Sequence, residues 1–347
     1  MASRRSLSAS RYIASILVGT VALAILAVAL PHDPYVRWQS FQGTMFERTR
    51  YFYERLHFDP TPVDVVFIGS SRTATGVEPR LLQQDLERRG LNYNVVDLSL
   101  PSDGMDIRVV EAREALLTHP ETRLLVISVV EALPRDGHQA FGDLASVGDI
   151  LSSPVIVNRS LPENLLRLPM RQMKLAAATA LPDAFDVQRT FLPDEYAGTL
   201  ASGRDLSGWS PQQPRHPYDS TAHAADLAAE SAFRKKDMTP PILPESLAWV
   251  EFGVSRSSIE EISRMARENG TRLAFLFLPF YDGYEAPAEL KWLEQFGPVW
   301  SATQLRRDPQ NYRDAAHGSP HAVPVINEWL AEKIAQDEAR NGADRGR

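Results

Sequence analysis

The chain has 347 residues, which is long enough for one large domain or two small ones with a sizeable hydrophobic core. Its composition, 44% hydrophobic and 23% charged residues, is that of a globular protein and excludes wholesale disorder. The formal net charge of -7 argues against a general nucleic-acid binder, because phosphate recognition needs a basic surface. The absence of cysteine excludes disulfide bonds, thiolate zinc sites and cysteine nucleophiles.

The N-terminus predicts a membrane-spanning helix. Arg4, Arg5 and Arg11 precede residues 12–31, which contain no charged residue. A helix of about 20 residues rises roughly 30 Å, enough to cross the hydrocarbon core. The arginines favour a cytoplasmic segment 1–11 and export of the rest of the chain. A cleaved signal peptide is the alternative, but the apolar run exceeds the usual length of about 7–15 residues, so we favour an uncleaved signal anchor.

Residues 32–60 read as an aromatic and basic juxtamembrane linker with a helix expected over 42–56. Its arginines and tyrosines suit either contact with the membrane surface or docking on the following domain.

From residue 63 the pattern alternates between buried strands and amphipathic helices, which predicts parallel βαβ units in a three-layer α/β domain over 61–335. In such sheets, ligands bind at the carboxyl ends of the strands. Strands are expected at 63–69, 93–100, 122–130 and 271–279, and helices at 77–90, 104–119, 257–269 and 322–335.

Residues 134–245 interrupt this alternation and are predicted to form an insertion over the strand ends. They hold a helical stretch at 162–181 and a polar stretch at 202–220 rich in Ser, Pro and Gly. Long irregular segments inside compact domains are usually functional or disordered. The last residues, 336–347, are expected to be a disordered tail.

The first strand ends in FIGSSRTATG, where serines directly follow a buried run. This stretch lacks the spacing of a P-loop or of a dinucleotide-binding turn, and Thr73 replaces the second glycine of a hydrolase elbow. What remains is a serine between a strand and a helix, where backbone N–H groups would stabilise an oxyanion. A helix cap rich in Ser and Thr is the alternative interpretation.

The C-terminal stretch DAAHGSPHA supplies the other two parts of a serine nucleophile. Asp314 stands three residues before His317, so its carboxylate can orient the imidazole and leave the second ring nitrogen to accept a proton. Serine, histidine and aspartate together are the groups that such a nucleophile requires. A metal site among these C-terminal Asp and His residues is the alternative, which we do not favour.

Together the two blocks resemble the SGNH (GDSL-like) hydrolase superfamily, and more closely its membrane-anchored bacterial branch of DltD-like and AlgX/AlgJ-like proteins. The resemblance implies a flavodoxin-like parallel sheet and no metal or other cofactor. Gly69-Ser70-Ser71 takes the place of the Gly-Asp-Ser block, so the nucleophile is carried over onto Ser71. The terminal block carries the orienting acid onto Asp314 and the general base onto His317, with His321 at the surface.

The two middle blocks of the family depart from its pattern. In the second block, Asp97, Ser99 and Ser102 stand where the family has Asn and two glycines, with Gly104 two residues further on. The resemblance then implies an oxyanion hole made by the Ser71 N–H with Ser102 or Gly104. The third block is absent, and Glu131 follows the third strand where an asparagine would donate. An ionised glutamate there would repel an oxyanion.

The resemblance implies an enzyme of the bacterial inner membrane with its catalytic domain in the periplasm. It would be an esterase or O-acyltransferase acting on a cell-envelope polysaccharide or glycolipid, with a membrane-bound acyl-donor protein as a further partner and no nucleic acid. A degenerate SGNH-like module that binds a glycan or an envelope-assembly partner is the second interpretation. Arg72, Trp209, Trp249, Trp292 and Trp300 could contact such substrates, although packing is the commoner use of these side chains.

Overall fold

A computed structural model describes residues 3–155, 158–196 and 213–345, with side chains over 9–155, 158–196 and 213–341. The part of the polar stretch at 202–212, including Trp209, lies outside the described residues, as do the last two residues. At the centre is a five-stranded sheet, all parallel, in the order β2-β1-β3-β4-β5. Its strands are β1 Val65–Ile68, β2 Val95–Asp97, β3 Leu124–Val129, β4 Arg272–Phe277 and β5 Val299–Ser301.

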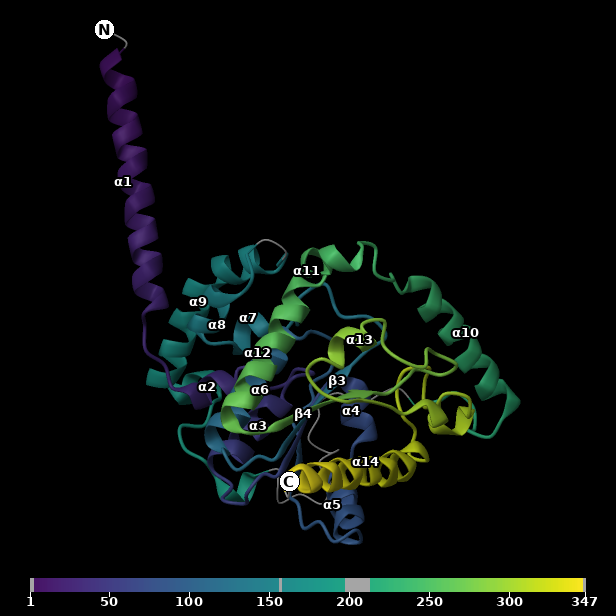
Figure 1. Cartoon of the computed structure of the whole chain (residues 1–347). Helices are drawn as coiled ribbons and strands as arrows, with labels where there is room; N and C mark the ends of the chain where they lie inside the picture. Colours follow the sequence, from purple (N-terminus) through teal and green to yellow (C-terminus); the bar gives the residue numbers. More distant parts are fainter. Residues whose placement is uncertain (1–2, 156–157, 197–212, 346–347) are drawn as a thin grey trace.

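The α/β class with a parallel sheet is confirmed, and helices pack on both faces (Figure 1). Every residue of β1 is buried, and its side chains alternate between two hydrophobic clusters. Val66 and Ile68 join helices α3 (Arg48–His57), α6 (Asp106–Thr118) and α12 (Gly253–Asn269) on one face. Val65 and Phe67 join α5 (Pro79–Glu87) and α14 (Ala322–Arg345) on the other.

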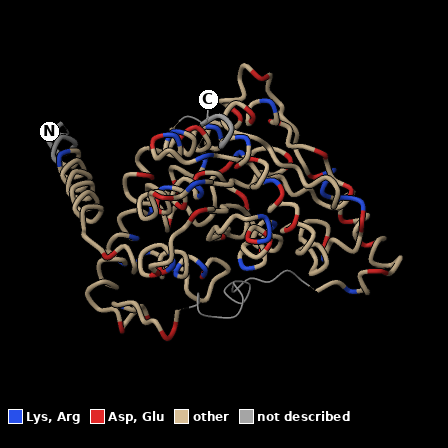
Figure 2. The backbone as a smooth tube through the Cα atoms, turned by 60° about the horizontal axis from the view of Figure 1, so that its bottom comes forward, with Lys and Arg blue, Asp and Glu red and all other residues tan. Residues whose placement is uncertain are grey.

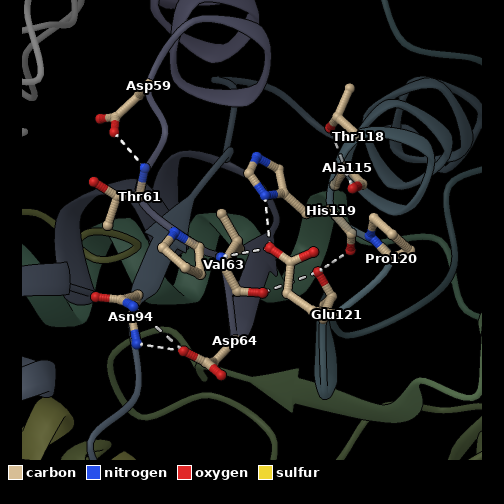
Figure 3. Close-up of polar contacts among 12 residues, drawn as sticks. Asp59, Thr61, Val63, Asp64, Asn94, Ala115, Thr118, His119, Pro120 and Glu121 are labelled. Carbon is tan, nitrogen blue, oxygen red and sulfur yellow. Dashed lines mark hydrogen bonds and ion pairs between the residues drawn. The ribbon is translucent and has the colours of Figure 1, made fainter.

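Polar contacts fix the amino ends of the strands, on the edge opposite the carboxyl ends (Figure 3). The Asp64 carboxylate accepts the Asn94 N–H at 2.9 Å, which ties the start of β1 to that of β2. The Glu121 carboxylate accepts the Val63 N–H at 3.2 Å, and Thr122 donates its hydroxyl to the Val63 carbonyl at 3.1 Å. These bonds hold β1 in register between its two neighbours.

The N-terminal helix α1 (Ser3–Val28) contains a stretch, Ala9–Val28, with a mean hydropathy of 2.1, long and apolar enough to cross a membrane. Figure 2 shows this helix without charged residues beyond its basic first turns. Among the residues that the structure describes, its C-terminal end alone touches the domain, beside α9 (Leu161–Ala180). There Ala27 is buried, and Gln172 donates its side-chain N–H to the Val28 carbonyl at 3.3 Å.

The juxtamembrane segment docks on the domain, one of the two roles that its composition suits. The expected helix over 42–56 is wrong at its start, because Gly43 with φ of 71° forms a turn and α3 begins at Arg48. A short helix, α2 (Pro34–Trp38), precedes this turn. Trp38 and Phe52 are almost completely buried in the core that covers one face of the sheet.

The region 134–245 contains the predicted helix near 162–181 as α9, together with α10, which sequence patterns did not predict. Its status as an insertion stays a prediction. The tail prediction is wrong as far as Arg345, because α14 continues there. The remaining elements are α4 Ser71–Gly76, α7 Phe141–Leu144, α8 Val147–Ser152, η1 Pro182–Phe185, η2 Pro193–Glu195, α10 Thr221–Asp237, η5 Glu245–Leu247, α11 Ala248–Glu251, α13 Leu290–Leu293, η6 Thr303–Leu305 and η7 Pro309–Asn311.

The close packing behind Gly69 generates a stability prediction. A Cβ at this position would lie 2.3 Å from Thr73 Oγ1 and 2.6 Å from Ser128 Cβ. We expect Gly69→Ala to lower the free energy of unfolding by about 1–3 kcal/mol, because the end of β1 would have to move. Urea unfolding of the full chain in detergent, followed by near-UV circular dichroism, measures this change.

Gly148→Ala is the matched control, because the nearest atom to a Cβ there is Ser146 Oγ at 3.5 Å, an ordinary contact. In helix α8 this control should be neutral or slightly stabilising, since alanine favours the helix more than glycine does. Equal stability of Gly69→Ala and the wild type would contradict the packing described at the end of β1.

Candidate active site

Ser71 lies at the carboxyl edge of the sheet, at the point where the strand order reverses. Strand β1 ends at Ile68, Ser70 occupies the N-cap position with extended backbone, and Ser71 is the first residue of α4. In a sheet of order 2-1-3-4-5, the next strand in the chain leaves on one side of β1 and the third strand on the other. The gap between β1 and β3 is where doubly wound proteins bind ligands.

The structure brings Ser71, His317 and Asp314 into one hydrogen-bonded chain. Ser71 Oγ lies 2.9 Å from His317 Nε2, and His317 Nδ1 lies 2.7 Å and 2.9 Å from the two Asp314 oxygens. An ionised carboxylate only accepts hydrogen bonds, so Nδ1 carries the proton and Nε2 accepts from the Ser71 hydroxyl. Ser71 is partly buried, and the His317 side chain is 14% exposed.

Asp314 is held ionised and in a fixed orientation. One of its oxygens accepts the N–H groups of Ala316 at 2.8 Å and of His317 at 3.0 Å. Burial alone would raise the pKa of Asp314, but the hydrogen bond and charge of His317, together with these N–H groups, outweigh it. The pKa of this carboxyl therefore lies below its ordinary value, as its orienting role requires.

The loop that carries His317 is fixed by contacts with β4's carboxyl end and with α10. Tyr312 pairs with Gly318 across the loop and donates its hydroxyl to the Pro279 carbonyl at 2.9 Å. From α10, His223 Nε2 lies 2.9 Å from the Tyr312 carbonyl, and Glu230 accepts the Ala315 N–H at 2.9 Å. Sequence patterns gave no signal for His223 and Glu230, because neither belongs to a motif.

A buried asparagine joins the serine helix to the C-terminal helix. Asn327 of α14 is fully buried, accepts the Glu78 N–H at 3.0 Å and donates to the Gly76 carbonyl at 3.0 Å. Gly76 is the last residue of α4, and His317 lies just before α14. The two halves of the candidate triad are thus tied together behind the site, by a residue that sequence patterns did not single out.

Glu131 does not stand next to the site as an uncompensated charge. Both of its oxygens accept from Arg72, at 2.6 Å and 2.9 Å, and Arg72 also donates to the Leu278 carbonyl at 3.1 Å. Both side chains are at most 9% exposed. Burial lowers the pKa of Arg72, but Glu131 more than reverses this and the net pKa is raised. The expected repulsion by an isolated glutamate is therefore wrong, because Arg72 neutralises its charge.

The residues compared above with the second block have two different roles. Asp97 and Ser99 are structural, whereas Ser102 and Gly104 lie in the loop beside the candidate site. Asp97 is buried, lies 3.5 Å from Arg48 of α3 and accepts the Ser99 N–H at 3.0 Å. Ser99 is also buried, so these two residues anchor the juxtamembrane helix. The loop runs on beside the serine block, where the Leu100 N–H donates to the Gly69 carbonyl at 3.1 Å.

The two candidate oxyanion residues follow in this loop. Ser102 has a φ of 76°, in the left-handed region that side chains rarely adopt. Gly104 packs against His138, whose backbone nitrogen would lie 2.5 Å from a Cβ at this position. The glycine is therefore required by packing, and the role of either N–H as an oxyanion donor stays a prediction.

A cleft with a volume of about 400 Å³ lies beside Arg72 and Glu131. The positive and negative charges of its lining are equal in number, with four arginines and four acidic residues. It is lined by Arg72, Asp103, Val130, Glu131, Ala132, Leu133, Pro134, Arg135, Asp136, Arg159, Arg234, Asp237, Met238, Thr239 and Phe280. Among the described residues, no group of three His, Asp or Glu side chains is placed to hold a metal ion.

His321 is exposed, as expected, and among the tryptophans Trp300 is buried in the core while Trp249 is 54% exposed. No protein-family model matches this chain, and no curated protein matches it in sequence. The proposed function therefore rests on the fold and on the geometry of the site.

The buried ion pair predicts an asymmetric response to substitution. Arg72→Met leaves the Glu131 carboxylate buried without its partner and should lower the free energy of unfolding by about 3–5 kcal/mol. The double variant Arg72→Met/Glu131→Met should be more stable than the single one, because no charge is then left unpaired. Urea unfolding in detergent measures both.

Arg159→Met is the control, since the pair of Arg159 and Asp136 lines the same cleft but is exposed, at 73% and 50%. It should stay close to wild-type stability. Additive losses in the double variant would contradict the pairing of Arg72 with Glu131.

The lowered pKa of Asp314 predicts a pH dependence of stability. A carboxyl whose pKa is lower in the folded state stabilises the fold above its unfolded pKa of about 3.9, and this contribution is lost as the pH falls through the folded pKa. The difference in unfolding free energy between the wild type and Asp314→Asn should therefore shrink between about pH 5 and about pH 2. Urea titrations of both proteins across this range measure it, and a constant difference would contradict the assignment.

Proposed function

We propose that the chain is a membrane-anchored serine esterase or O-acyltransferase of the SGNH type. The hydrogen-bonded chain Ser71–His317–Asp314 carries the proposal, with a nitrogen-to-oxygen contact of 2.9 Å at the nucleophile. A serine, a histidine base and an orienting aspartate within hydrogen-bond reach are the diagnostic arrangement for acyl transfer. The strand order, with helices on both faces, supports the three-layer SGNH arrangement.

In the proposed mechanism, Ser71 Oγ attacks the carbonyl carbon of an acyl ester while His317 Nε2 accepts the hydroxyl proton. Asp314 keeps the imidazole in the required tautomer and stabilises the imidazolium. Collapse of the tetrahedral intermediate breaks the ester bond, and His317 returns the proton to the leaving alcohol. Water or a sugar hydroxyl then attacks the acyl-serine by the reverse sequence, so the same site serves hydrolysis or transfer.

The negative charge of the tetrahedral intermediate requires N–H donors. The Ser71 N–H lies in the first turn of α4, where backbone donors have no partner within the helix. We assign the second donor to Ser102 or Gly104. Neutralisation of Glu131 by Arg72 supports this arrangement, because it removes the charge that would oppose the oxyanion.

We further propose that the substrate is a cell-envelope polysaccharide or glycolipid, handled on the periplasmic side of a bacterial inner membrane. The helix at Ala9–Val28 and the basic residues before it support single-pass anchoring with the domain exported. The balanced charges of the cleft beside Arg72 suit a polar ligand rich in hydroxyl groups. A membrane-bound acyl-donor protein is the partner that the transfer reaction would require.

A non-catalytic SGNH-like module that binds a glycan or an assembly partner is the second candidate. One observation favours it: Glu131 and its partner Arg72 occupy the place of the third block, where a donor to the oxyanion would stand. Loss of one oxyanion donor typically lowers the rate by about 10²–10³-fold, so weak catalysis and none at all are both compatible with this substitution.

Labelling with a serine-directed fluorophosphonate tests the enzyme proposal. We expect label on the wild-type protein at Ser71 and none on Ser71→Ala, because only the serine that His317 activates attacks the reagent. Hydrolysis of an aryl acetate should fall by about 10⁶-fold in Ser71→Ala and by about 10⁴-fold in Asp314→Asn. Peptide mass spectrometry locates the label.

Ser70→Ala is the matched control, since Ser70 is adjacent in the chain, 2% exposed and makes no capping bond with its side chain. It should keep both the label and the activity. A folded wild-type protein that takes no label at Ser71 would exclude the enzyme and leave the binding module.

A further inference from the structure

We propose that the domain rests directly on the lipid surface, through an apolar face formed by α8, α9 and α11 and here called the membrane face. This inference rests on the proposed anchoring by α1 and goes beyond it, since a single span could equally hold the domain at a distance. In and beside these helices the face comprises Leu151, Leu166, Met170, Met173, Ile242 and Trp249, each at least 42% exposed.

The exposed residues of α9 form a stripe rather than a scatter. Leu166, Met170 and Met173 follow the i, i+4, i+7 spacing of one helix face and are 83%, 67% and 42% exposed. The opposite side of the helix is used for packing, where Leu168 and Leu175 are buried. Thus α9 is apolar on both sides, and its outer side has no protein partner among the described residues.

The position of α1 indicates that lipid covers this stripe. The end of α1 packs on α9 through Ala27 and the bond between Gln172 and Val28. Further along the same two segments, the Asp33 N–H donates to Thr179 at 3.0 Å. Residues 28 and 33 therefore face 172 and 179, so the N-terminal half of α9 points along α1 toward the membrane, as Figure 1 shows.

Other exposed apolar residues lie on the same side of the molecule. In Figure 1, α8 and α9 lie near the end of α1 at the left of the domain, and α11 lies at the upper margin, the side toward which α1 rises. Trp249 of α11 is 54% exposed and Ile242, just before η5, is 71% exposed. Tryptophan is enriched where protein meets the lipid headgroups. On α9, Lys174 is exposed beside the apolar stripe and can meet an anionic headgroup, whereas Arg171 is buried and Arg167 pairs with Asp143 and Glu163.

The membrane face adjoins the cleft that is lined by Arg72, the residue next to Ser71 in the chain. Met238 and Thr239 line the cleft, and Ile242 follows in the same segment. This segment is fixed in place, because Glu251 of α11 accepts the Ile242 N–H at 2.9 Å and Arg135 donates to the Thr239 carbonyl at 3.0 Å. A substrate carried at the bilayer surface would therefore meet the cleft without leaving the lipid headgroup region.

Depth-dependent quenching in vesicles tests the proposal on the full chain. Because the chain has no cysteine, Leu166→Cys and Trp249→Cys each give one attachment site for the fluorophore NBD. The labelled proteins are reconstituted into phosphatidylcholine–phosphatidylglycerol vesicles with or without a lipid that carries a nitroxide near the headgroup. An apolar face buried about 5–10 Å at the interface should give at least about twofold quenching at both positions.

Leu117→Cys is the matched control, since this leucine is 73% exposed but lies at the C-terminal end of α6, by the amino ends of the strands. It should stay unquenched. Val18→Cys lies at the middle of the span, so it reports the anchor itself with a second lipid whose nitroxide sits deep in the acyl chain. Quenching at Val18 without quenching at Leu166 and Trp249 overturns the membrane face and leaves the anchor standing. Absence of quenching at Val18 overturns both, while fluorophosphonate labelling of Ser71 on the same vesicles reports separately on the enzyme.

Discussion

The hydrogen bond between Ser71 and His317 joins residues 246 positions apart in the chain, and much of the structure serves to maintain it. Asn327 ties α14 to the end of α4, and Glu230 of α10 holds the backbone of the histidine loop. The first contact holds the end of the serine helix and the second holds the histidine loop, so both halves of the pair are fixed in place. A positioned nucleophile and base lose little free energy to reorganisation when a substrate arrives.

The pair of Arg72 and Glu131 shows how a carboxylate near the candidate nucleophile can be compatible with the proposed chemistry. A buried carboxylate beside a developing oxyanion would oppose catalysis, but the bidentate bonds at 2.6 Å and 2.9 Å remove its net charge. Arg72 follows β1 and Glu131 follows β3, so the ion pair joins the segments after the two strands that flank the switch point. Because Arg72 directly follows Ser71, the ion pair fixes the backbone that carries the candidate nucleophile.

Local patterns predicted four of the five strands and the residues of the candidate triad, because continuous apolar runs and the Asp-x-x-His spacing are properties of short segments. Strand β5 has only three residues after Pro298 and is defined by its pairing with β4. Likewise, nothing near Glu131 in the chain points to Arg72, 59 residues away. The support from His223 and Asn327 is invisible for the same reason, since each acts through contacts that only the tertiary fold creates.

The location of the cleft bears on the choice between hydrolysis and transfer. Both reactions pass through the same acyl-serine, so the outcome depends on which hydroxyl reaches it first. A cleft in bulk solvent would favour water by concentration alone. A cleft whose wall continues into an apolar face at the bilayer would instead meet acceptors held in the membrane. Such acceptors have a high effective concentration at the surface. The proposed membrane face would therefore shift the proposed acyl-enzyme toward transfer onto an envelope glycan or glycolipid.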